Sequence, residues 1–510
     1  MKIYRRNCGI LMHPSSLPSV HGIGSLGDDA LKFIDLLSCM HVTLWQVLPL
    51  GPTGFGDSPY AVRSTFAGNE LLIDLNELAA EGFLGLEDVL QVSGMFFPQR
   101  IDYGRVRSVK EPLLDKAAVA FLAEGGSTEK QFVAFCRENS FWLDDYALYV
   151  ILCRLYGDSR WFSKWPEDIK RRKDSTLASL QKKYRDAILN VKVIQYFFFR
   201  QWAKVKAYAN EHGIRIIGDI PIFVASDSVD AWCNVKLLKM DDDLQQTASS
   251  GVPPDAFSAD GQLWGNPVYD WDNHIKTNFA WWTDRIRNTL KLCDSIRIDH
   301  FRGLSAYWEI PQGEKTAIHG KWVQAPGQLL LDHLRETLGP DLPFIAEDLG
   351  VITDDVEELR DNNRLPGMKI LQFAFGFSKD GAFDASNAYL PHNCIENSAV
   401  YTGTHDNDTT RGWYDKLDGR TKDAIRRYLE CPDDQIVWEM LRAMLMSNSR
   451  WAILPIQDLL ELGSEGRMNV PSTCGTSNWS WRMPRLQVDQ WRMERLKDMI
   501  DRYGRYDGKA

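Results

Sequence analysis

The sequence predicts an α/β protein built as a (β/α)8 TIM barrel with large, mainly helical insertions at the carboxyl-end face of its strands. Eight short runs along the chain are continuously apolar and rich in β-branched residues, as in parallel strands that are buried on both faces. Amphipathic stretches lie between most of these runs and supply crossover helices. The 510 residues are about twice what a plain barrel needs, so about half of the chain is expected to be insertion.

Each predicted strand ends in a polar or acidic residue and is followed by a turn of Gly, Pro or Asn. In chain order the strands are expected at 8–13, 43–50, 214–219, 295–299, 343–347, 368–375, 399–405 and 451–457. Apolar residues at helical spacing predict crossover helices at 28–39, 196–212 and 356–363. Since chemistry in such barrels sits at the carboxyl ends of the strands, the strand-ending residues are the candidates for function.

Residues 1–510 are expected to form a single catalytic barrel unit with two insertions. The first, at 51–213, is mainly helical, with helices predicted at 113–123, 129–138, 144–156 and 175–208. The second, at 225–273, is a looped segment rich in Gly, Pro, Asp and Trp, and we expect it to act as a lid.

Composition excludes several classes of function. The net charge of −10 and the lack of a basic block argue against a nucleic-acid partner, and no apolar run is long enough to predict a membrane span. Nine scattered cysteines without a Cys-x-x-Cys pair argue against disulfides and a zinc ribbon. No His, Asp and Glu spacing resembles a zinc motif, and Asp406, Asn407 and Asp408 lack the Gly and the distal Glu that would complete a calcium loop, so neither a metal nor a cofactor is expected. The start is too short for a signal peptide, which predicts a cytoplasmic protein, or a plastid one whose transit peptide is missing from this sequence.

Three strand ends carry carboxylates: Asp299 on the fourth strand, Glu347 on the fifth and Asp406 on the seventh. One alone is most simply a helix cap or a turn residue, but three at one end of a barrel suggest chemistry. Breaking a glycosidic bond needs one carboxylate at the anomeric carbon and one carboxylic acid at the leaving oxygen. Adjacent strands, such as the fourth and fifth, can bring two such side chains together.

Arg297 lies two residues before Asp299, so the two side chains share one face of the strand. A guanidinium there favours the ionised carboxylate that a nucleophile needs, although a purely structural ion pair fits the pattern too. His405 beside Asp406 and His300 beside Asp299 are placed either to donate to sugar hydroxyls or to cap a turn.

Nine motifs, in this order along essentially the whole chain, resemble the amylomaltases, the 4-α-glucanotransferases (disproportionating enzymes) of glycoside hydrolase family 77. They are GILMHPSSLP (9–18), WQVLPLGP (45–52), GDSPY (56–60), GDIPI (218–222), GVPPD (251–255), GQLWGNP (261–267), RIDHFRG (297–303), AEDLG (346–350) and THDND (404–408). The fold of that family agrees with the barrel that the strand pattern predicts.

The resemblance implies a role for each candidate. Asp299 would be the nucleophile that forms a glycosyl-enzyme, Glu347 the general acid and then base, and Asp406 the residue that grips hydroxyls of the distorted sugar. The sugar subsite would be completed by Tyr60, which stacks on the ring, and by Asp219, Arg297 and His405. Trp264, Asn266 and Phe257 would belong to the lid and line the acceptor side. Two positions depart from the family pattern: Ala256 replaces an aromatic residue and Ser472 replaces a glycine.

The sequence therefore predicts a retaining transferase that moves α-1,4-glucan segments between malto-oligosaccharides, including glucans derived from starch or glycogen. An α-amylase-type hydrolase, which passes the same intermediate to water, is the first alternative. A glycan-binding barrel without activity is the second, and the three carboxylates argue against it.

Overall fold

An eight-stranded parallel barrel forms the centre of the molecule. The computed structural model describes residues 5–254 and 258–508. The barrel strands close in chain order, and the last pairs in parallel with the first: β1 (Asn7–Leu11), β2 (Leu44–Gln46), β3 (Arg215–Ile220), β6 (Ser295–Ile298), β9 (Phe344–Ala346), β10 (Gly367–Ile370), β11 (Ser398–Tyr401) and β12 (Trp451–Pro455). The predicted fold class is confirmed, with every strand inside or within one residue of a predicted run.

The ladders are shorter than most of the predicted runs because the chain bends out of the barrel before the apolar run ends. The run at 43–50 contributes only Leu44–Gln46 to β2, although Val47 still donates a backbone hydrogen bond to Ile217. The run at 368–375 continues as a 3-10 turn over Leu371–Phe373. Apolar character thus predicts burial of these segments better than it predicts the end of each strand.

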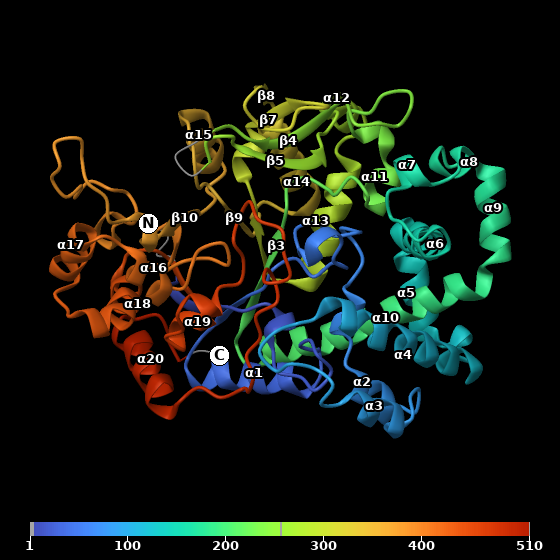
Figure 1. The fold of residues 1–510 in the computed structure, drawn as a ribbon, viewed down its shortest axis with the longest axis horizontal. Coiled ribbons are helices and arrows are strands. Elements are labelled where there is room, and N and C mark those ends of the chain that lie inside the picture. Colours follow the sequence, from blue (N-terminus) through green and yellow to red (C-terminus); the bar gives the residue numbers. More distant parts are fainter. Residues whose placement is uncertain (1–4, 255–257, 509–510) are drawn as a thin grey trace.

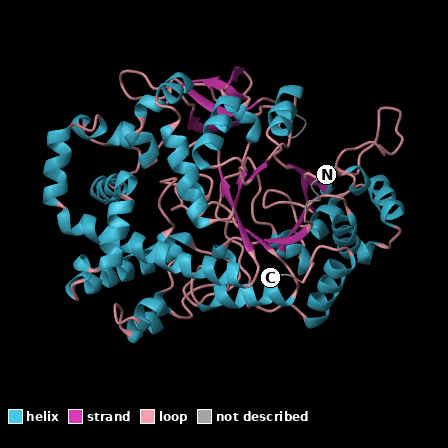
Figure 2. Ribbon diagram, turned by 180° about the vertical axis from the view of Figure 1, so that it is seen from behind, coloured by secondary structure: helices cyan, strands magenta, loops and turns pink. Residues whose placement is uncertain are grey.

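Helices surround the barrel (Figures 1 and 2). Helix α1 (Asp28–Cys39) has the predicted bounds, and Ala30, Phe33, Ile34 and Leu37 form its buried stripe at helical spacing. The other helices that follow barrel strands include α13 (Ala280–Leu292), α14 (Gly327–Leu338), α15 (Asp354–Asn362), α18 (Ile436–Met446) and α20 (Gln490–Arg502). No helix in the described ranges has both the length and the apolar character that crossing a bilayer requires.

Helices also fill the chain between β2 and β3. They are α2 (Leu75–Ala80), α3 (Leu86–Val92), α4 (Tyr103–Ala123), α5 (Lys130–Glu138), α6 (Ser140–Tyr156), α7 (Trp161–Lys164), α8 (Glu167–Lys170), α9 (Asp174–Lys183) and α10 (Arg185–Glu211). In Figure 1, α5 to α9 form a lobe at one end of the molecule, opposite α16 (Thr410–Lys416) and α17 (Gly419–Leu429). The single helix expected at 175–208 is wrong: Tyr184, with φ −107° and ψ 23°, leaves helical geometry and separates α9 from α10. Apolar periodicity does not reveal a one-residue break.

A second sheet, which the strand pattern of the sequence did not predict, lies apart from the barrel strands (Figure 2). Its antiparallel order is β5-β4-β7-β8, from β4 (Ala248–Val252), β5 (Gln262–Pro267), β7 (Ala306–Pro311) and β8 (Lys321–Gln324). The segment 225–273 therefore contains the β4–β5 hairpin, together with α11 (Val229–Cys233) and the first residues of α12 (Trp271–Lys276). Pairing with β7 ties this hairpin to the chain that follows β6. Its movement as a lid stays a prediction.

Candidate functional site

The three predicted carboxylates directly follow barrel strands, or follow them within a few residues. Asp299 comes after β6, Glu347 after β9, and Asp406 five residues beyond the end of β11. Because all strands of the barrel are parallel, the three side chains emerge at the same end. Strands β6 and β9 are hydrogen-bonded neighbours, so Asp299 and Glu347 leave the sheet side by side.

Arg297 links two carboxylates on β3 and β6. Its Nη1 lies 2.7 Å from Asp219 Oδ2, and its Nη2 lies 2.7 Å from Asp299 Oδ1. The register of the sheet accounts for the first contact, since Asp219 and Arg297 are paired across β3 and β6. The expected ion pair with Asp299 is thus present, and the Arg297 side chain is buried while Asp299 remains 29% exposed. One face of Asp299 is fixed by the guanidinium and the rest is open to a ligand.

The charges of these linked side chains shift the pKa values of Arg297 and Asp219. Burial lowers the pKa of Arg297, but the carboxylates of Asp219 and Asp299 outweigh it and hold that pKa well above its ordinary value. Burial raises the pKa of Asp219 to about 6; Arg297 opposes this rise and the negative charge of Asp299 adds to it. Arg297 is therefore a permanent cation at the floor of the site.

Tyr60, on the loop after β2, contacts Asp219 and so extends this group of linked side chains. Its hydroxyl donates to Asp219 Oδ2 at 2.7 Å, and its ring stacks on His405 with the ring centres 5.0 Å apart. Burial and the neighbouring Asp219 raise the pKa of Tyr60 well above its usual value, so the hydroxyl stays a donor. His405 covers one face of the ring, and the ring of Trp479 lies tilted beside it with the ring centres 5.8 Å apart. Stacking of Tyr60 on a sugar, which the resemblance implies, stays a prediction.

Glu347 accepts two backbone hydrogen bonds. Its Oε2 accepts from the N–H of His300 at 2.7 Å, and its Oε1 accepts from the N–H of Leu349 at 2.9 Å. Burial raises the pKa of Glu347 to about 8; the charge of Asp299 adds to the rise, while Arg297 and the two N–H groups oppose it. This upward shift favours the protonated form of Glu347 near neutral pH, which suits a general acid.

His300 owes its place beside Glu347 to an unusual backbone conformation. Its φ of +53° lies in the left-handed region, which turns its N–H toward the Glu347 carboxyl group. Burial lowers the pKa of the His300 imidazole to about 3, with a further contribution from Arg302, so the ring is neutral. His300 thus shapes the site through its main chain and adds no charge.

Asp406 has the opposite electrostatic setting. Its Oδ2 lies 3.3 Å from His405 Nε2, and its Oδ1 accepts from Asn469 Nδ2 at 2.7 Å. Partial burial opposes ionisation, but His405, Asn469 and the more distant Arg297 outweigh it, so the pKa of Asp406 lies well below its ordinary value. The side chain is 43% exposed, which leaves this carboxylate free to accept from hydroxyl groups of a ligand.

The predicted acceptor-side residues lie on β5. Trp264 is 37% exposed and stands edge-on to the ring of His300, with the ring centres 4.8 Å apart. The Asn266 side chain donates to the backbone carbonyl of Val224 at 2.9 Å, so it ties the hairpin to the chain after β3. Phe257 and the departure at Ala256 lie outside the described residues.

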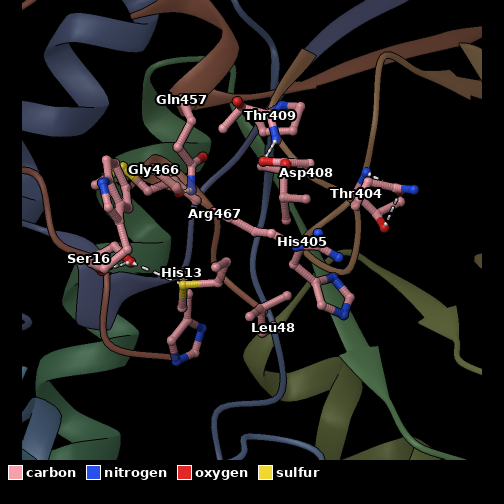
Figure 3. Close-up of a pocket in the computed structure, with 16 residues that line it drawn as sticks. His13, Ser16, Leu48, Thr404, His405, Asp408, Thr409, Gln457, Gly466 and Arg467 are labelled. Carbon is pink, nitrogen blue, oxygen red and sulfur yellow. Dashed lines mark hydrogen bonds between the residues drawn. The ribbon is translucent and has the colours of Figure 1, made fainter. Parts of the chain in front are cut away.

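Two further observations concern the edges of the site. A pocket of about 450 Å³, partly open to solvent, adjoins His405 on the side of β1 and β12, and its lining includes His13 and Arg467 (Figure 3). Burial lowers the pKa of His13 to about 3, and His405 adds to this effect, so His13 is neutral beside it. Ser472, the second departure, has φ +61°, a left-handed conformation that explains why glycine is usual there.

Sequence reasoning missed the groups that hold the carboxylates in place. The N–H groups of His300 and Leu349 have no signal in the sequence, because any residue other than proline supplies one. Asn469 lies 63 residues beyond Asp406, and no local pattern in the sequence marks it as a partner of that carboxylate. Within the described ranges, no three His, Cys, Asp or Glu side chains are grouped to hold a metal ion.

Comparisons with known proteins identify the family of the chain. The family model described as 4-alpha-glucanotransferase matches residues 12–488. A 4-alpha-glucanotransferase of Synechocystis sp. is 44% identical over 98% of both chains. A chloroplastic/amyloplastic 4-alpha-glucanotransferase of Solanum tuberosum is 42% identical over 98% of this chain and 87% of its own. The solved structure of an amylomaltase from Streptococcus agalactiae in complex with acarbose superposes with a TM-score of 0.94 at 40% identity, covering 99% of this chain and all of that one.

Proposed function

Because the chain belongs to the 4-alpha-glucanotransferase family, we propose that it transfers α-1,4-glucan segments between malto-oligosaccharides with retention at the anomeric carbon. The observation that carries this proposal is the pairing of two unlike carboxyl groups on neighbouring strands. Asp299 is ion-paired with Arg297, and the raised pKa of Glu347 beside it favours its protonated form near neutral pH. Retaining transfer needs such a nucleophile and such an acid.

In the first half-reaction, an Asp299 oxygen attacks the anomeric carbon and Glu347 gives its proton to the departing glycosidic oxygen. The bond to the reducing-end part of the donor breaks, and the remaining glucan is held covalently on Asp299. Glu347 is then ionised. In the second half-reaction it takes the proton of the 4-hydroxyl group of an incoming glucan, whose oxygen displaces Asp299 and restores both carboxyl groups.

The surrounding residues bind and orient the donor sugar. Asp406 is ionised and partly exposed, which suits it to accept hydrogen bonds from two ring hydroxyls. His405 and Tyr60 form the stacked wall beside it, and Asp219 holds Arg297 against Asp299. Trp264 and Phe257 are proposed to stack the incoming glucose and to reduce the access of water, with Asn266 fixing their hairpin.

The substrates proposed are malto-oligosaccharides and glucans derived from starch or glycogen. Acarbose, an analogue that the Streptococcus agalactiae amylomaltase binds in its solved structure, supports a glucan-like ligand. No nucleic acid, metal or cofactor is proposed to take part. Relatives occur in bacteria and in plant plastids, so the compartment, cytoplasm or plastid, stays a prediction.

Incubation with maltotriose tests the function. Transfer creates as many reducing ends as it consumes, so we expect a ladder of longer glucans together with glucose or maltose, at a nearly constant total of reducing ends. The products are resolved by chromatography and the reducing ends are measured in the same samples. A steep rise in reducing ends without any product longer than maltotriose would identify a hydrolase and overturn the proposal.

A further inference from the structure

The strand that carries Glu347 is weakly held on one side. Strand β9 has three residues, and all three pair with β6, from Ile296↔Phe344 to Ile298↔Ala346. Toward β10 the ladder consists of the single pair Gly367↔Ala346. Glu347 follows at once, so the ladder to β10 stops immediately before the proposed acid. The main chain of Glu347 is itself bonded on the β6 side, where its N–H donates to Ile298 and its carbonyl accepts from the N–H of Phe301, both at 3.1 Å, so contact toward β10 beyond Ala346 must come from another group.

The side chain of Asp348 supplies that contact. Its Oδ1 accepts from the backbone N–H of Met368 at 2.7 Å, and its Oδ2 accepts from Arg360 Nη1 at 2.5 Å. Met368 lies within β10 and Arg360 lies on α15, so one carboxylate joins the end of β9 to the next strand and the next helix. The Asp348 side chain is 2% exposed, so solvent does not compete for these bonds.

The packing around Asp348 is built for this carboxylate. A Cβ atom at Gly367 would lie 2.3 Å from Asp348 Oδ2 and 3.1 Å from Arg360 Cδ, so the absence of a side chain at 367 makes room for the ion pair. Arg360 also contacts Asp361, through its Nε at 2.7 Å, and remains paired on its solvent side. The contacts of Asp348 with Met368 and Arg360, which we call the junction, therefore hold the main chain in place beside the reacting groups.

Asp348 lies between the two residues whose geometry matters for acid catalysis. Glu347 carries the carboxyl group, and the N–H of Leu349 binds its Oε1 at 2.9 Å. A main chain that shifts at 348 moves both the carboxyl group and that donor relative to His300. Because proton transfer depends on hydrogen-bond distance, a small shift lowers the rate of the acid-catalysed step.

We propose that Asp348 is a positioning residue: by binding Met368 and Arg360 it holds residues 347–349 so that the Glu347 carboxyl group is aligned with the glycosidic oxygen. The proposal rests on the proposed role of Glu347 as the acid. The proposal predicts that Asp348 is required only for donors whose leaving group has to be protonated. A leaving group that departs without protonation makes the junction dispensable, whereas damage to the fold would affect every substrate alike.

The test compares two donors in Asp348→Ala and Asp348→Asn. With maltotriose, which needs the acid, we expect Asp348→Ala to lose about 10²-fold in turnover. With α-maltosyl fluoride, the first burst of fluoride release should fall less than about tenfold, since fluoride leaves without general acid help. Asp348→Asn keeps an oxygen for the Met368 N–H and should retain more maltotriose activity than the alanine variant. Glu358→Gln, which removes an exposed carboxylate from the same helix α15, is the matched control and should stay near the unmodified protein.

Equal losses on both donors, or no loss with maltotriose, would overturn the proposal. If Asp348→Ala does not fold, as circular dichroism will show, the donor comparison in Asp348→Asn decides on the same criterion. This test and the test of the proposed function can fail separately. Hydrolysis instead of transfer by the unmodified protein would overturn the proposed function. The comparison of the losses with maltotriose and with α-maltosyl fluoride would still report on the first half-reaction, which a hydrolase shares.

Discussion

Glu347 and Asp406 are carboxyl groups at the same end of one barrel, yet their surroundings drive them to opposite protonation states. Burial and the charge of Asp299 raise the pKa of Glu347 to about 8, and its direct partners are two backbone N–H groups. Asp406 is more open, and His405 and Asn469 bind it directly, so its pKa lies well below the usual range. The difference shows that neighbours, and not residue type, decide which group carries the proton.

The same comparison extends to Asp299, whose direct partner is the Arg297 guanidinium. We call the carboxyl-end face of the barrel strands the rim. Asp299 and Asp406 thus form an anionic side of the rim, and Glu347 forms a proton-carrying side. A retaining transfer needs both sides at once, because attack and protonation occur on opposite sides of the same glycosidic bond. Five predictions probe this division.

The largest effect is expected from removal of the anionic nucleophile. Asp299→Asn keeps the shape of the side chain but leaves no carboxylate to form the covalent intermediate, so transfer from maltotriose should fall by about 10⁴-fold or more. Binding of the donor should survive, since Asp406 and Tyr60 remain. The rate is measured from product ladders and binding by calorimetry, with Asp284→Asn, a change at an exposed ion pair on α13, as control. Near-normal turnover in folded Asp299→Asn would show that the nucleophile has been assigned wrongly.

Replacing Glu347, the proposed proton donor, should lower turnover less than Asp299→Asn does, and the size of the loss should depend on the donor. Glu347→Gln still accepts hydrogen bonds but has no proton to give, so turnover with maltotriose should fall about 10²- to 10⁴-fold. The first release of fluoride from α-maltosyl fluoride should fall far less. Glu357→Gln, at an exposed position of α15, controls for loss of a carboxylate. A loss of the same size with both donors would argue against general acid catalysis by Glu347.

The pH dependence should report the proton on Glu347. The acid is active when protonated, so activity should be lost as the pH rises through about 8, falling about tenfold for each further pH unit. Because Gln cannot ionise, this alkaline limb should disappear in Glu347→Gln. Initial rates with saturating maltotriose between pH 5 and pH 10, roughly the range over which such limbs are followed, provide the measurement. An unchanged limb in the variant would mean that another group is titrating.

The division of the rim was partly predictable from sequence, and the reason is geometric. Apolar runs that end in a charged residue identify the ends of buried parallel strands, and this pattern is enough to place Asp299, Glu347 and Asp406 at one face of the barrel. The two-residue spacing also predicted the contact between Arg297 and Asp299. Signals of this kind depend on local periodicity, and so they are carried by the sequence itself.

What the sequence could not show depends on contacts between distant segments. Strand β7 pairs with the distant strand β4, from Ala248↔Pro311 to Gly251↔Trp308, and the Ala-Ser-Ser-Gly-Val run of β4 has no strong strand character. The bond from Asn469 to Asp406 and the N–H groups that bind Glu347 leave no pattern either. The protonation states of Glu347 and Asp406, which depend on those contacts, were therefore beyond prediction.

A smaller effect is expected on the choice between a sugar and water as the acceptor, because Glu347 serves as the base for both. Once the intermediate has formed, ionised Glu347 can take a proton from a sugar hydroxyl or from water, and positioning of the sugar favours transfer. Trp264→Ala and Phe257→Ala should each raise the share of hydrolysis several-fold, while total cleavage of maltotriose changes less. Reducing ends per transfer product are the measure, and Trp491→Ala, at an exposed position of α20, is the control. An unchanged ratio in both variants would place the acceptor elsewhere.

The smallest effect, none, is expected from chelation. The carboxylates at this end of the barrel have partners within the protein: Arg297 contacts both Asp219 and Asp299 at 2.7 Å, while His405 and Asn469 bind Asp406. Calcium in proteins typically takes about six to eight oxygen ligands, and within the described residues no three His, Cys, Asp or Glu side chains are grouped to hold a metal ion. Exhaustive dialysis against a chelator should thus leave both the maltotriose rate and the melting temperature unchanged. Loss of activity that calcium restores would show that a bound cation, and not Arg297 alone, maintains the anionic side, and it would favour the amylase-like alternative.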